Sequence, residues 1–246
     1  MSQYQTAHKV ARTVDHRVLA EALRRAQAVG RPGVLVFDLD STLLDNRPRQ
    51  VAILREFGVL HGIAALAKSQ PAHWVSWDLR DAMRNAGVDE PSIERLADEA
   101  KVFWRERFFT SEYCRLDVAV VGARDYLLAV RDSGARIAYC TGRHEAMRTG
   151  TVDNFTDLGM PVPDGVAVDL LMKPTFDQSD DDWKIMAYDR LRALGTVQAA
   201  FDNEPTHING YRVAFPDALM VHLATDHSGR PVTLLDGIVS VEDFRL

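Results

Sequence analysis

The fold is decided by one stretch of the sequence, Val34-Leu35-Val36-Phe37-Asp38-Leu39-Asp40-Ser41-Thr42. Its four apolar residues follow a proline and a glycine, and are typical of a buried strand rather than of a separate helix. Two acids, one residue apart, come directly afterwards. Residues i and i+2 of an extended chain point the same way, so Asp38 and Asp40 are expected to converge. Two carboxylates this close require a cation between them, or a proton on one of them.

Composition limits the class of protein. With 246 residues, 46% of them hydrophobic and 26% charged, the chain can form a large domain or a domain with a subdomain. Its formal net charge of −6 gives no electrostatic case for a nucleic-acid or anionic-membrane partner. It has two cysteines, which favours a reducing compartment. Without a signal-peptide core or a run of about 18 apolar residues, we expect a cytoplasmic protein with no membrane partner.

The chain changes character after Thr42. Residues 46–117 contain at least three helical patterns and no convincing strand. Beyond them, strands and helices alternate, which is typical of a parallel sheet covered on both faces. The further strands are expected at 135–140, 166–172, 197–201 and 218–223. We therefore predict a doubly wound α/β core formed by residues 1–45 and 118–246, with an inserted all-helical subdomain at 46–117.

Polar residues follow the expected strands. Thr141-Gly142-Arg143 comes after the second strand, Lys173 after the third and Asp202-Asn203 after the fourth. In open parallel sheets the ligand site lies beyond the carboxyl ends of the strands. We expect these residues to meet Asp38 and Asp40 there. A simpler interpretation, in which Asp40 and the two hydroxyl residues after it only cap a helix, does not explain the other polar strand ends.

In this order, the residues resemble the four motifs of the haloacid dehalogenase-like (HAD) hydrolases. The first motif, D-x-D-x-T/V, matches 38–42, and the hydroxyl residue of the second matches Thr141. The third is a lysine upstream of the fourth strand. The fourth matches Asp202-Asn203-Glu204-Pro205, which is similar to the D-[DN]-x-P version of small carboxy-terminal-domain phosphatases and polynucleotide 3′-phosphatase domains. The resemblance covers about residues 34–223, and the helical insertion resembles the C1-type cap.

The resemblance implies phosphoryl transfer. Asp38 would be the nucleophile that forms an aspartyl-phosphate, and Asp40 the general acid and then the general base. Mg²⁺ would be held by Asp38, the main-chain carbonyl of Asp40, and Asp202 or Asn203. The D-N version of the fourth motif implies Asn203 as the direct ligand, with Asp202 beside it.

Two lysines are candidates for the third motif. Lys184 lies at the start of the helix expected at 183–194, before the fourth strand, and has the D-x-x-K context of the polynucleotide-phosphatase group. Lys173 precedes a proline, as in the K-P version found elsewhere in the family. We favour Lys184 as the catalytic lysine. The phosphate-binding set is predicted to be Thr141, Gly142, Lys184 and Lys173.

Several other residues were assigned structural roles. Glu204 and His207 are predicted to lie on the surface at the start of a helix, and His144 is predicted to begin a helix. The aromatic residues of the insertion are interpreted as helix-packing core rather than as a substrate box; they are Trp74, Trp77, Phe103, Trp104, Phe108 and Phe109.

Taken together, the sequence predicts a Mg²⁺-dependent phosphatase acting on a small phosphomonoester. The second acid, Asp40, points to phosphate rather than carbon–halogen substrates, since a halide leaves without a proton. The alternatives are a receiver-like signalling module, a non-hydrolytic HAD-fold binding protein, a phosphomutase and a nucleic-acid 3′-phosphatase. The acidic net charge counts against the last of these. The physiological substrate, the motion of the cap and the oligomeric state cannot be read from the sequence.

Overall fold

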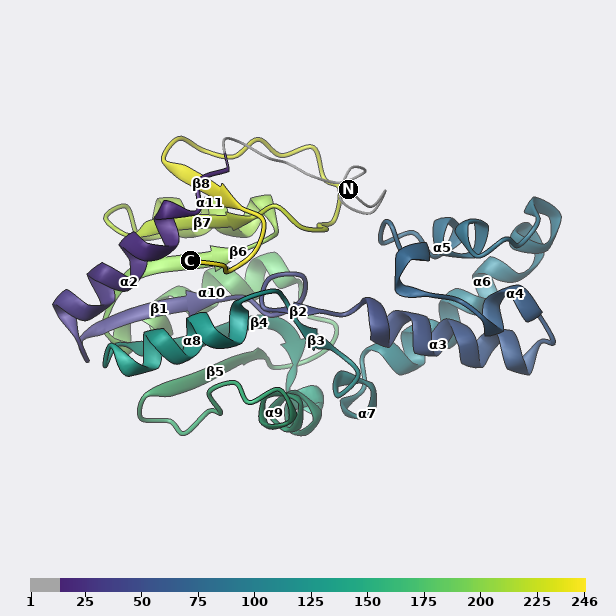
Figure 1. The fold of residues 1–246 in the computed structure, drawn as a ribbon, viewed down its shortest axis with the longest axis horizontal. Coiled ribbons are helices and arrows are strands. Elements are labelled where there is room, and N and C mark those ends of the chain that lie inside the picture. The colour runs from purple at the N-terminus through teal and green to yellow at the C-terminus, as the bar shows by residue number, and fades with distance from the viewer. Residues whose placement is uncertain (1–13) are drawn as a thin grey trace.

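Six parallel strands form the main sheet, in the order β5-β4-β1-β6-β7-β8 (Figure 1). The computed structural model describes residues 14–246, so the part of the predicted core before residue 14 lies outside the described residues. The strands are β1 (Gly33–Phe37), β4 (Arg136–His144), β5 (Val168–Lys173), β6 (Thr196–Asp202), β7 (Leu219–Leu223) and β8 (Ile238–Val241). The predicted parallel α/β sheet is confirmed, and β8 is a strand that the sequence did not indicate.

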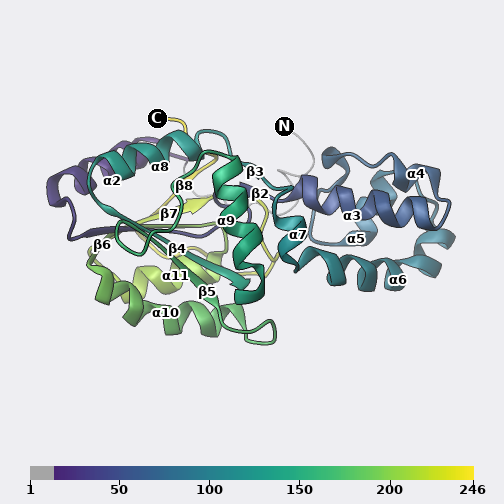
Figure 2. The ribbon, with the colours of Figure 1, turned by 90° about the horizontal axis from the view of Figure 1, so that it is seen from below.

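Helices cover both faces of this sheet. Figure 2 shows α2 and α8 on one side of it and α10 and α11 on the other. Alternation along β1 supplies both cores: Leu35 and Phe37 pack with the first pair of helices and α9, while Val34 and Val36 pack with the second pair. The helices are α2 (Arg17–Val29), α8 (Ala123–Asp132), α9 (Arg148–Asp157), α10 (Asp180–Leu194) and α11 (Pro205–Ala214).

Strand β1 occupies the position where the strand order reverses. Its neighbours are β4 on one side and β6 on the other, and the chain reaches them through connections that lie on opposite faces. Such a reversal opens a crevice at the carboxyl ends of the strands. The acids of the decisive stretch follow β1 at this point, and the main-chain N–H of Asp38 donates to Phe201 O at 2.9 Å.

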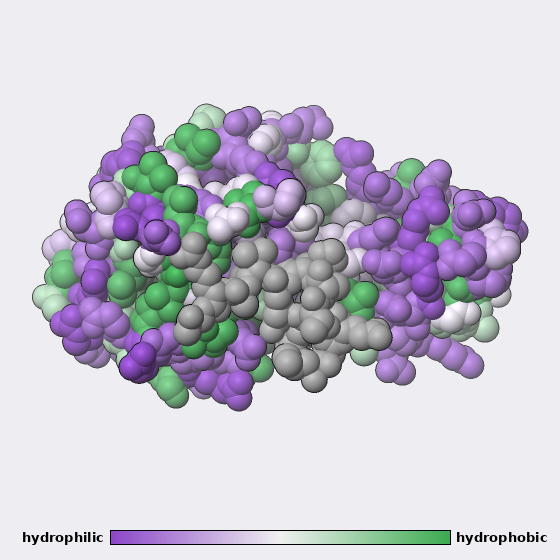
Figure 3. All heavy atoms as spheres, turned by 90° about the horizontal axis from the view of Figure 1, so that it is seen from above, coloured by the Kyte–Doolittle hydropathy of each residue, from purple (hydrophilic) through white to green (hydrophobic). Residues whose placement is uncertain are grey.

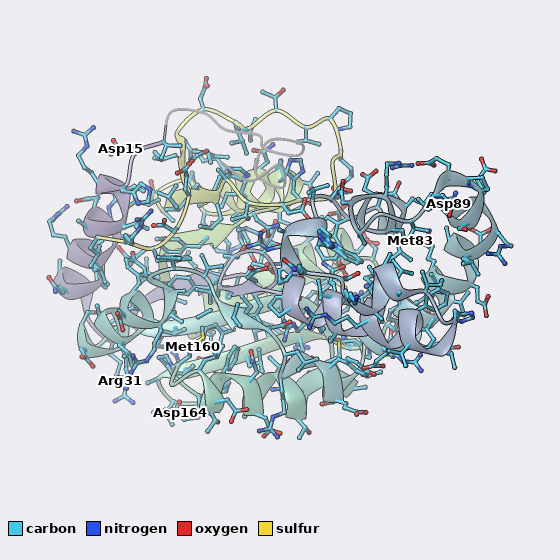
Figure 4. The ribbon with its side chains drawn as sticks, turned by 45° about the vertical axis from the view of Figure 1, so that its right-hand side comes forward. Asp15, Arg31, Met83, Asp89, Met160 and Asp164 are labelled. Atoms are coloured by element: carbon cyan, nitrogen blue, oxygen red, sulfur yellow. The ribbon has the colours of Figure 1, made fainter. Side chains whose placement is uncertain are left out.

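The inserted residues form a separate group of helices beside the α/β unit, which we call the helical unit (residues 47–108). Its helices are α3 (Arg47–Leu60), α4 (Ala64–Ala67), α5 (Leu79–Asn85) and α6 (Glu90–Phe108). It has its own hydrophobic cluster, which includes Phe57, Trp74 and Met83. In Figure 4, Met83 and Asp89 lie in this unit, whereas the four other labelled residues lie in the α/β unit.

A short antiparallel ribbon joins the two units. Strand β2 (Leu44–Asp45) pairs with β3 (Val118–Ala119), so the two chain crossings lie side by side. The predicted boundaries of the insertion, 45/46 and 117/118, coincide with the ends of these strands. Between the helical unit and β3 the chain forms the short helix α7 (Ser111–Cys114), which packs against α9.

Two local predictions were wrong. Strand β4 continues through Thr141-Gly142-Arg143 to His144, four residues beyond its predicted end, and His144 is then the N-cap of the short 3-10 helix η2 (Glu145–Met147) that leads into α9. Its pairing with β5 resumes at His144 and Lys173 after a change of register, which extends the strand. Helix α10 begins at Asp180, three residues earlier than expected, because the Ser179 hydroxyl accepts a hydrogen bond from the N–H of Asp182.

Hydrophilic residues dominate the face of the helical unit seen in Figure 3, whereas hydrophobic residues are interspersed over the α/β unit. None of the helices in residues 14–246 combines the length and apolar composition that crossing a bilayer requires.

The turn after Asp40 adopts a strained backbone conformation. Ser41 has a φ of 60° and is the one non-glycine residue with a positive φ in the described part of the chain. The left-handed region costs an L-residue about 1–2 kcal/mol, and a β-branched residue still more. Strain of this kind is typical of functional turns.

Substitution of Ser41 should therefore change stability in a defined order. Glycine relieves the strain but gains unfolded-state entropy, so Ser41→Gly is expected to raise the free energy of unfolding by about 0.5 kcal/mol. Ser41→Val is expected to lower it by about 2 kcal/mol. Urea unfolding measures both, with Ser41→Ala as the control that removes only the hydroxyl. Equal stability of the glycine and valine variants would contradict this reading of the turn.

Candidate active site

A buried ammonium group joins two carboxylates at the centre of the crevice. Lys184 Nζ lies 2.7 Å from Asp38 Oδ1 and 2.9 Å from Asp202 Oδ2, and donates to Cys140 O at 2.6 Å. These partners come from the ends of β1 and β6 and from β4, while the lysine comes from α10. The preceding residue, Trp183, donates its indole N–H to Thr141 O at 2.8 Å, which fixes α10 against β4. Four predicted site residues therefore meet: Asp38, Thr141, Lys184 and Asp202.

One ammonium group faces two buried carboxylates, and their pKa values diverge. Burial and the Asp202 carboxylate raise the pKa of Asp38 to about 7, although Lys184 opposes them. For Asp202, burial also raises the pKa, but Lys184 and His207 outweigh it and hold the pKa well below its usual range. Burial lowers the pKa of Lys184, but the two carboxylates outweigh it and raise the pKa. When both carboxylates are ionised, Asp38 and Asp202 carry two negative charges against the one positive charge of Lys184. An additional cation would therefore favour the ionised form of Asp38.

Asp40 points into a second cluster of charges. Arg143 binds it bidentately, Nε to Oδ2 at 2.9 Å and Nη2 to Oδ1 at 2.7 Å, and Arg49 Nη2 reaches Oδ1 at 2.8 Å. Burial raises the pKa of Asp40, but the two guanidinium groups outweigh it and hold the pKa far below its usual range. Asp40 is therefore ionised while both arginines are bound.

Asp117 completes this cluster. Its Oδ1 lies 3.0 Å from Arg49 Nε, and its Oδ2 accepts a hydrogen bond from Arg143. The side chains of Arg49 and Asp117 are fully buried. They lie just inside the two ends of the insertion, so the cluster connects both crossings to Asp40. Breaking such a buried pair leaves an uncompensated charge, which is costly.

Arg49 and Asp117 are functional-site residues that the sequence motifs did not indicate. One signal was available for the arginine: the first turn of α3 contains Arg47 and Arg49 and no acidic residue. Cations at a helix N-terminus oppose the helix dipole, so two of them there indicate partners elsewhere. Arg47 pairs with Asp45 at 2.5 Å. No comparable signal marked Asp117.

Two of the predicted metal ligands, Asn203 and Asp202, already make hydrogen bonds to other groups of the protein. Asn203 Oδ1 accepts from the Thr42 hydroxyl at 3.0 Å, and its main-chain N–H donates to the same hydroxyl at 3.0 Å. Asp202 Oδ1 accepts from the N–H of Glu204 at 2.9 Å, while Oδ2 binds Lys184. Asp38 Oδ2 accepts no hydrogen bond from the residues that the structure describes.

Oxygen donors of this kind fit Mg²⁺. The candidate ligands are carboxylate, carbonyl and amide oxygens, which a hard cation prefers, and the Asp38–Asp202 pair carries excess negative charge. Within residues 14–246, no group of three or more His, Cys, Asp or Glu side chains is arranged to hold a metal ion. Any Mg²⁺ site here would thus depend on main-chain and amide oxygens and on substrate. The four predicted ligands, Asp38, Asp40, Asp202 and Asn203, stay a prediction.

The other candidate lysine has a different partner. Lys173 Nζ lies 2.6 Å from Asp180 Oδ1, on the flank of the site. The same carboxylate lies close to Gly142, where a Cβ would be 2.8 Å from it. Lys184, rather than Lys173, makes the contact with Asp38.

A cavity of about 250 Å³ opens over these groups. Its walls combine polar residues of the α/β unit with aromatic residues of the helical unit and the segment after it. The lining residues used below are Asp38, Asp40, Arg143, Asp180, Glu204, His207, Trp77, Trp104, Phe108 and Phe109. Trp77, Trp104, Phe108 and Phe109 pack against one another, in line with their interpretation as packing residues, and they also line the cavity.

The prediction that Glu204 and His207 lie on the surface was also wrong. Glu204 is buried, with Oε1 accepting from the Ser228 hydroxyl at 2.9 Å. His207 Nε2 lies 2.8 Å from Asp181 Oδ1, and Nδ1 lies 3.7 Å from Asp202 Oδ1. Burial lowers the pKa of His207, but the Asp202 carboxylate outweighs it and raises the pKa.

The raised pKa of Asp38 makes a prediction about stability. The contribution of the Asp38 carboxyl to the free energy of unfolding is fully present below pH 4, because the folded state favours its protonated form. This contribution is lost as the pH rises through about 7. A rise of about three pKa units corresponds to at most ~4 kcal/mol. Asp38→Asn should therefore unfold like the wild type at pH 4, but be more stable at pH 8. Urea unfolding in EDTA tests this, with the exposed Asp125→Asn as control. A stability difference that does not grow with pH would contradict the shift.

The chain resembles known proteins in part of its sequence and in its fold. No protein-family model matches the chain. A phosphoglycolate phosphatase from Pseudomonas putida is 28% identical over 118 residues, a match that covers 46% of this chain and 43% of that protein. The chain thus matches less than half the length of this relative.

Two solved structures share the fold. Protein tyrosine kinase A of Mycobacterium tuberculosis superimposes with a TM-score of 0.56 at 19% identity, over 86% of this chain and 94% of that one. A candidate phosphatase from Clostridium difficile superimposes with a TM-score of 0.55 at 15% identity, over 85% of this chain and 94% of that one. The chain is thus similar in sequence to a phosphoglycolate phosphatase over part of its length, and it shares its fold with these two proteins.

Proposed function

We propose that the protein is a Mg²⁺-dependent phosphatase that hydrolyses a small phosphomonoester through an aspartyl-phosphate on Asp38. The observation that carries the proposal is the contact between Lys184 and Asp38 in the buried crevice, with the Asp40 cluster beside it. A lysine that neutralises the nucleophile also stabilises negative charge on a transferring phosphoryl group. Residues 46–117 would act as a cap, since aromatic residues from this segment line the cavity.

In the first step, Asp38 Oδ2 attacks phosphorus. The bond to the leaving oxygen breaks, and that oxygen takes a proton from Asp40. In the second step, Asp40 takes a proton from water, whose oxygen attacks phosphorus; the bond between phosphorus and Asp38 Oδ2 breaks, which releases inorganic phosphate and restores the Asp38 carboxylate. Thr141 and Gly142 would hold phosphoryl oxygens during both steps.

Asp40 must be protonated for the first step, although its arginine partners keep it ionised at rest. Arg143 lines the cavity, so a bound phosphate dianion would compete with Asp40 for its guanidinium group. That competition raises the pKa of Asp40 only when substrate is present. The general acid would thus become available as the substrate binds.

A bound Mg²⁺ would neutralise the anionic groups that must approach one another. Asp38, the main-chain carbonyl of Asp40, and Asn203 or Asp202 would hold it. Mg²⁺ and a proton compete for the Asp38 carboxylate, so the binding of Mg²⁺ should favour the ionised form of this nucleophile.

Hydrolysis of p-nitrophenyl phosphate tests the proposal. The wild type should turn over with Mg²⁺ and not with EDTA, while Asp38→Asn and Asp40→Asn should lose at least 100-fold in kcat, the scale typical of general acid–base catalysis. Mg²⁺ should also raise the melting temperature of the wild type but not of Asp38→Asn. The acid limb of the pH profile should move to lower pH as Mg²⁺ increases, because Asp38 must be ionised.

Folded protein that hydrolyses neither this substrate nor acetyl phosphate would argue against a phosphatase. If Asp38 then retained a stable phosphoryl group, or bound BeF₃⁻ without turnover, a signalling role would be favoured.

The two lysines should differ in effect. Lys184→Met removes the positive charge between Asp38 and Asp202, so we expect kcat to fall at least 100-fold. Lys173→Met removes a pair with Asp180 on the flank of the site and should change kcat less than tenfold. Steady-state kinetics, with circular dichroism to confirm folding, separates the two. The reverse order would assign the catalytic lysine to Lys173.

A further inference from the structure

Four aromatic rings form one wall of the cavity over Asp38 and Asp40. Trp104 stacks on Phe108 with centroids 4.6 Å apart, and Trp77 meets the same ring edge-on at 5.9 Å. Phe109 contacts Trp104 edge-on at 5.5 Å. The rings therefore brace one another, which fixes their faces relative to the cavity and limits what ordering them on binding would cost.

A larger cavity begins at the same two indoles. It has a volume of about 730 Å³ and shares Trp77 and Trp104 with the smaller one. It lies between the helical unit and the loop after β7, which contributes His227 and Ser228. A leaving group that extends from the smaller cavity toward the larger one would pass these two indoles.

The indole of Trp104 offers a polar contact as well. Its N–H is buried and has no acceptor in the part of the chain that the structure describes. A buried indole N–H usually has a partner, because leaving it without one is costly. A ligand with an acceptor at its ring edge would supply the missing partner.

The smaller cavity is poorly suited to an acidic leaving group. Of the residues that line it, only Arg143 and His207 can be cations. Arg143 binds Asp40 and Asp117, and His207 lies against Asp181. A carboxylate on the leaving group would face Asp180 and Glu204 with no uncommitted cation among these lining residues.

Building on the proposed function, we propose that the substrate's leaving group carries an uncharged aromatic or heteroaromatic ring that lies against Trp77 and Trp104. Small hydroxy-acid leaving groups, such as that of phosphoglycolate, would be disfavoured. The ring would gain contact with the indole faces at the junction of the two cavities, while the phosphate stays at Asp38.

Binding of inert phosphonates tests this without turnover. Calorimetry with Mg²⁺ would compare benzylphosphonate with methylphosphonate and with phosphonoacetate, which carries a carboxylate. We expect benzylphosphonate to bind about tenfold more tightly than methylphosphonate, a gap that one well-placed aromatic contact accounts for. Phosphonoacetate should bind no more tightly than methylphosphonate.

The variants Trp77→Leu and Trp104→Leu should each reduce the gap. The matched control is Phe103→Leu: Phe103 packs against Phe57 at 5.4 Å, lies in the same unit and lines neither cavity, so the gap should persist. Tightest binding by phosphonoacetate, no measurable benzylphosphonate binding, or a gap unchanged in both tryptophan variants would overturn the inference.

A kinetic comparison separates this inference from the proposed function. Ethyl phosphate and 2-phenylethyl phosphate have leaving groups of similar basicity, so kcat/KM reports the ring contact. A tenfold preference for the phenylethyl ester supports the inference, and equal values with real turnover overturn it. If neither ester is hydrolysed and p-nitrophenyl phosphate and acetyl phosphate are not hydrolysed either, the phosphatase proposal fails, and the phosphonate result still decides whether the ring site exists.

Discussion

The contact of Lys184 with Asp38 and Asp202 is the constraint on which the rest of the structure depends. It ties α10 to three neighbouring strands, since the same ammonium group also binds Cys140 O. Two carboxylates at the end of a buried sheet would repel each other without it. Lys184 is itself buried, so its position is set by packing rather than by solvent. The Lys184 ammonium group therefore both holds α10 against the sheet and takes part in the proposed chemistry. Because it faces two carboxylates, the site would still favour the binding of another cation.

Much of this architecture was readable from local patterns. The apolar run before Asp38, the alternation of strands and helices, and the polar residues after each strand each follow from short-range spacing, and together they located the crevice. The choice of Lys184 over Lys173 rested on four residues of context, and the structure gives Lys184 the contact with Asp38. The predictions that were wrong depend on contacts between residues far apart in the sequence. Whether Glu204 and His207 are buried depends on the loop after β7 and on the packing of α10, both distant in sequence.

The charged cluster around Asp40 is a second case in which contacts distant in sequence could not be predicted from local patterns. Arg49 and Asp117 are 68 residues apart, and only the closure of the insertion brings them together. A pair of this kind leaves no periodicity in the sequence, apart from the unfavourable arginines in the first turn of α3. The aromatic wall was missed for a related reason: rings at helical spacing look alike whether they pack inward or border a cavity, and Trp104 does both.

The ribbon of β2 and β3 has a consequence for how such a protein can diversify. Leu44 pairs with Ala119 and Asp45 with Val118, so the whole insertion forms the tip of a hairpin whose two strands are β2 and β3. Its two ends remain neighbours whatever lies between them, so lengthening or replacing that segment adds little loop-closure entropy to the core. Selection could exchange the contents of the tip, and with them the leaving groups accepted, while the nucleophile strand stayed untouched. The buried pair of Arg49 and Asp117, just inside the two ends of the insertion, would have to be carried over or compensated.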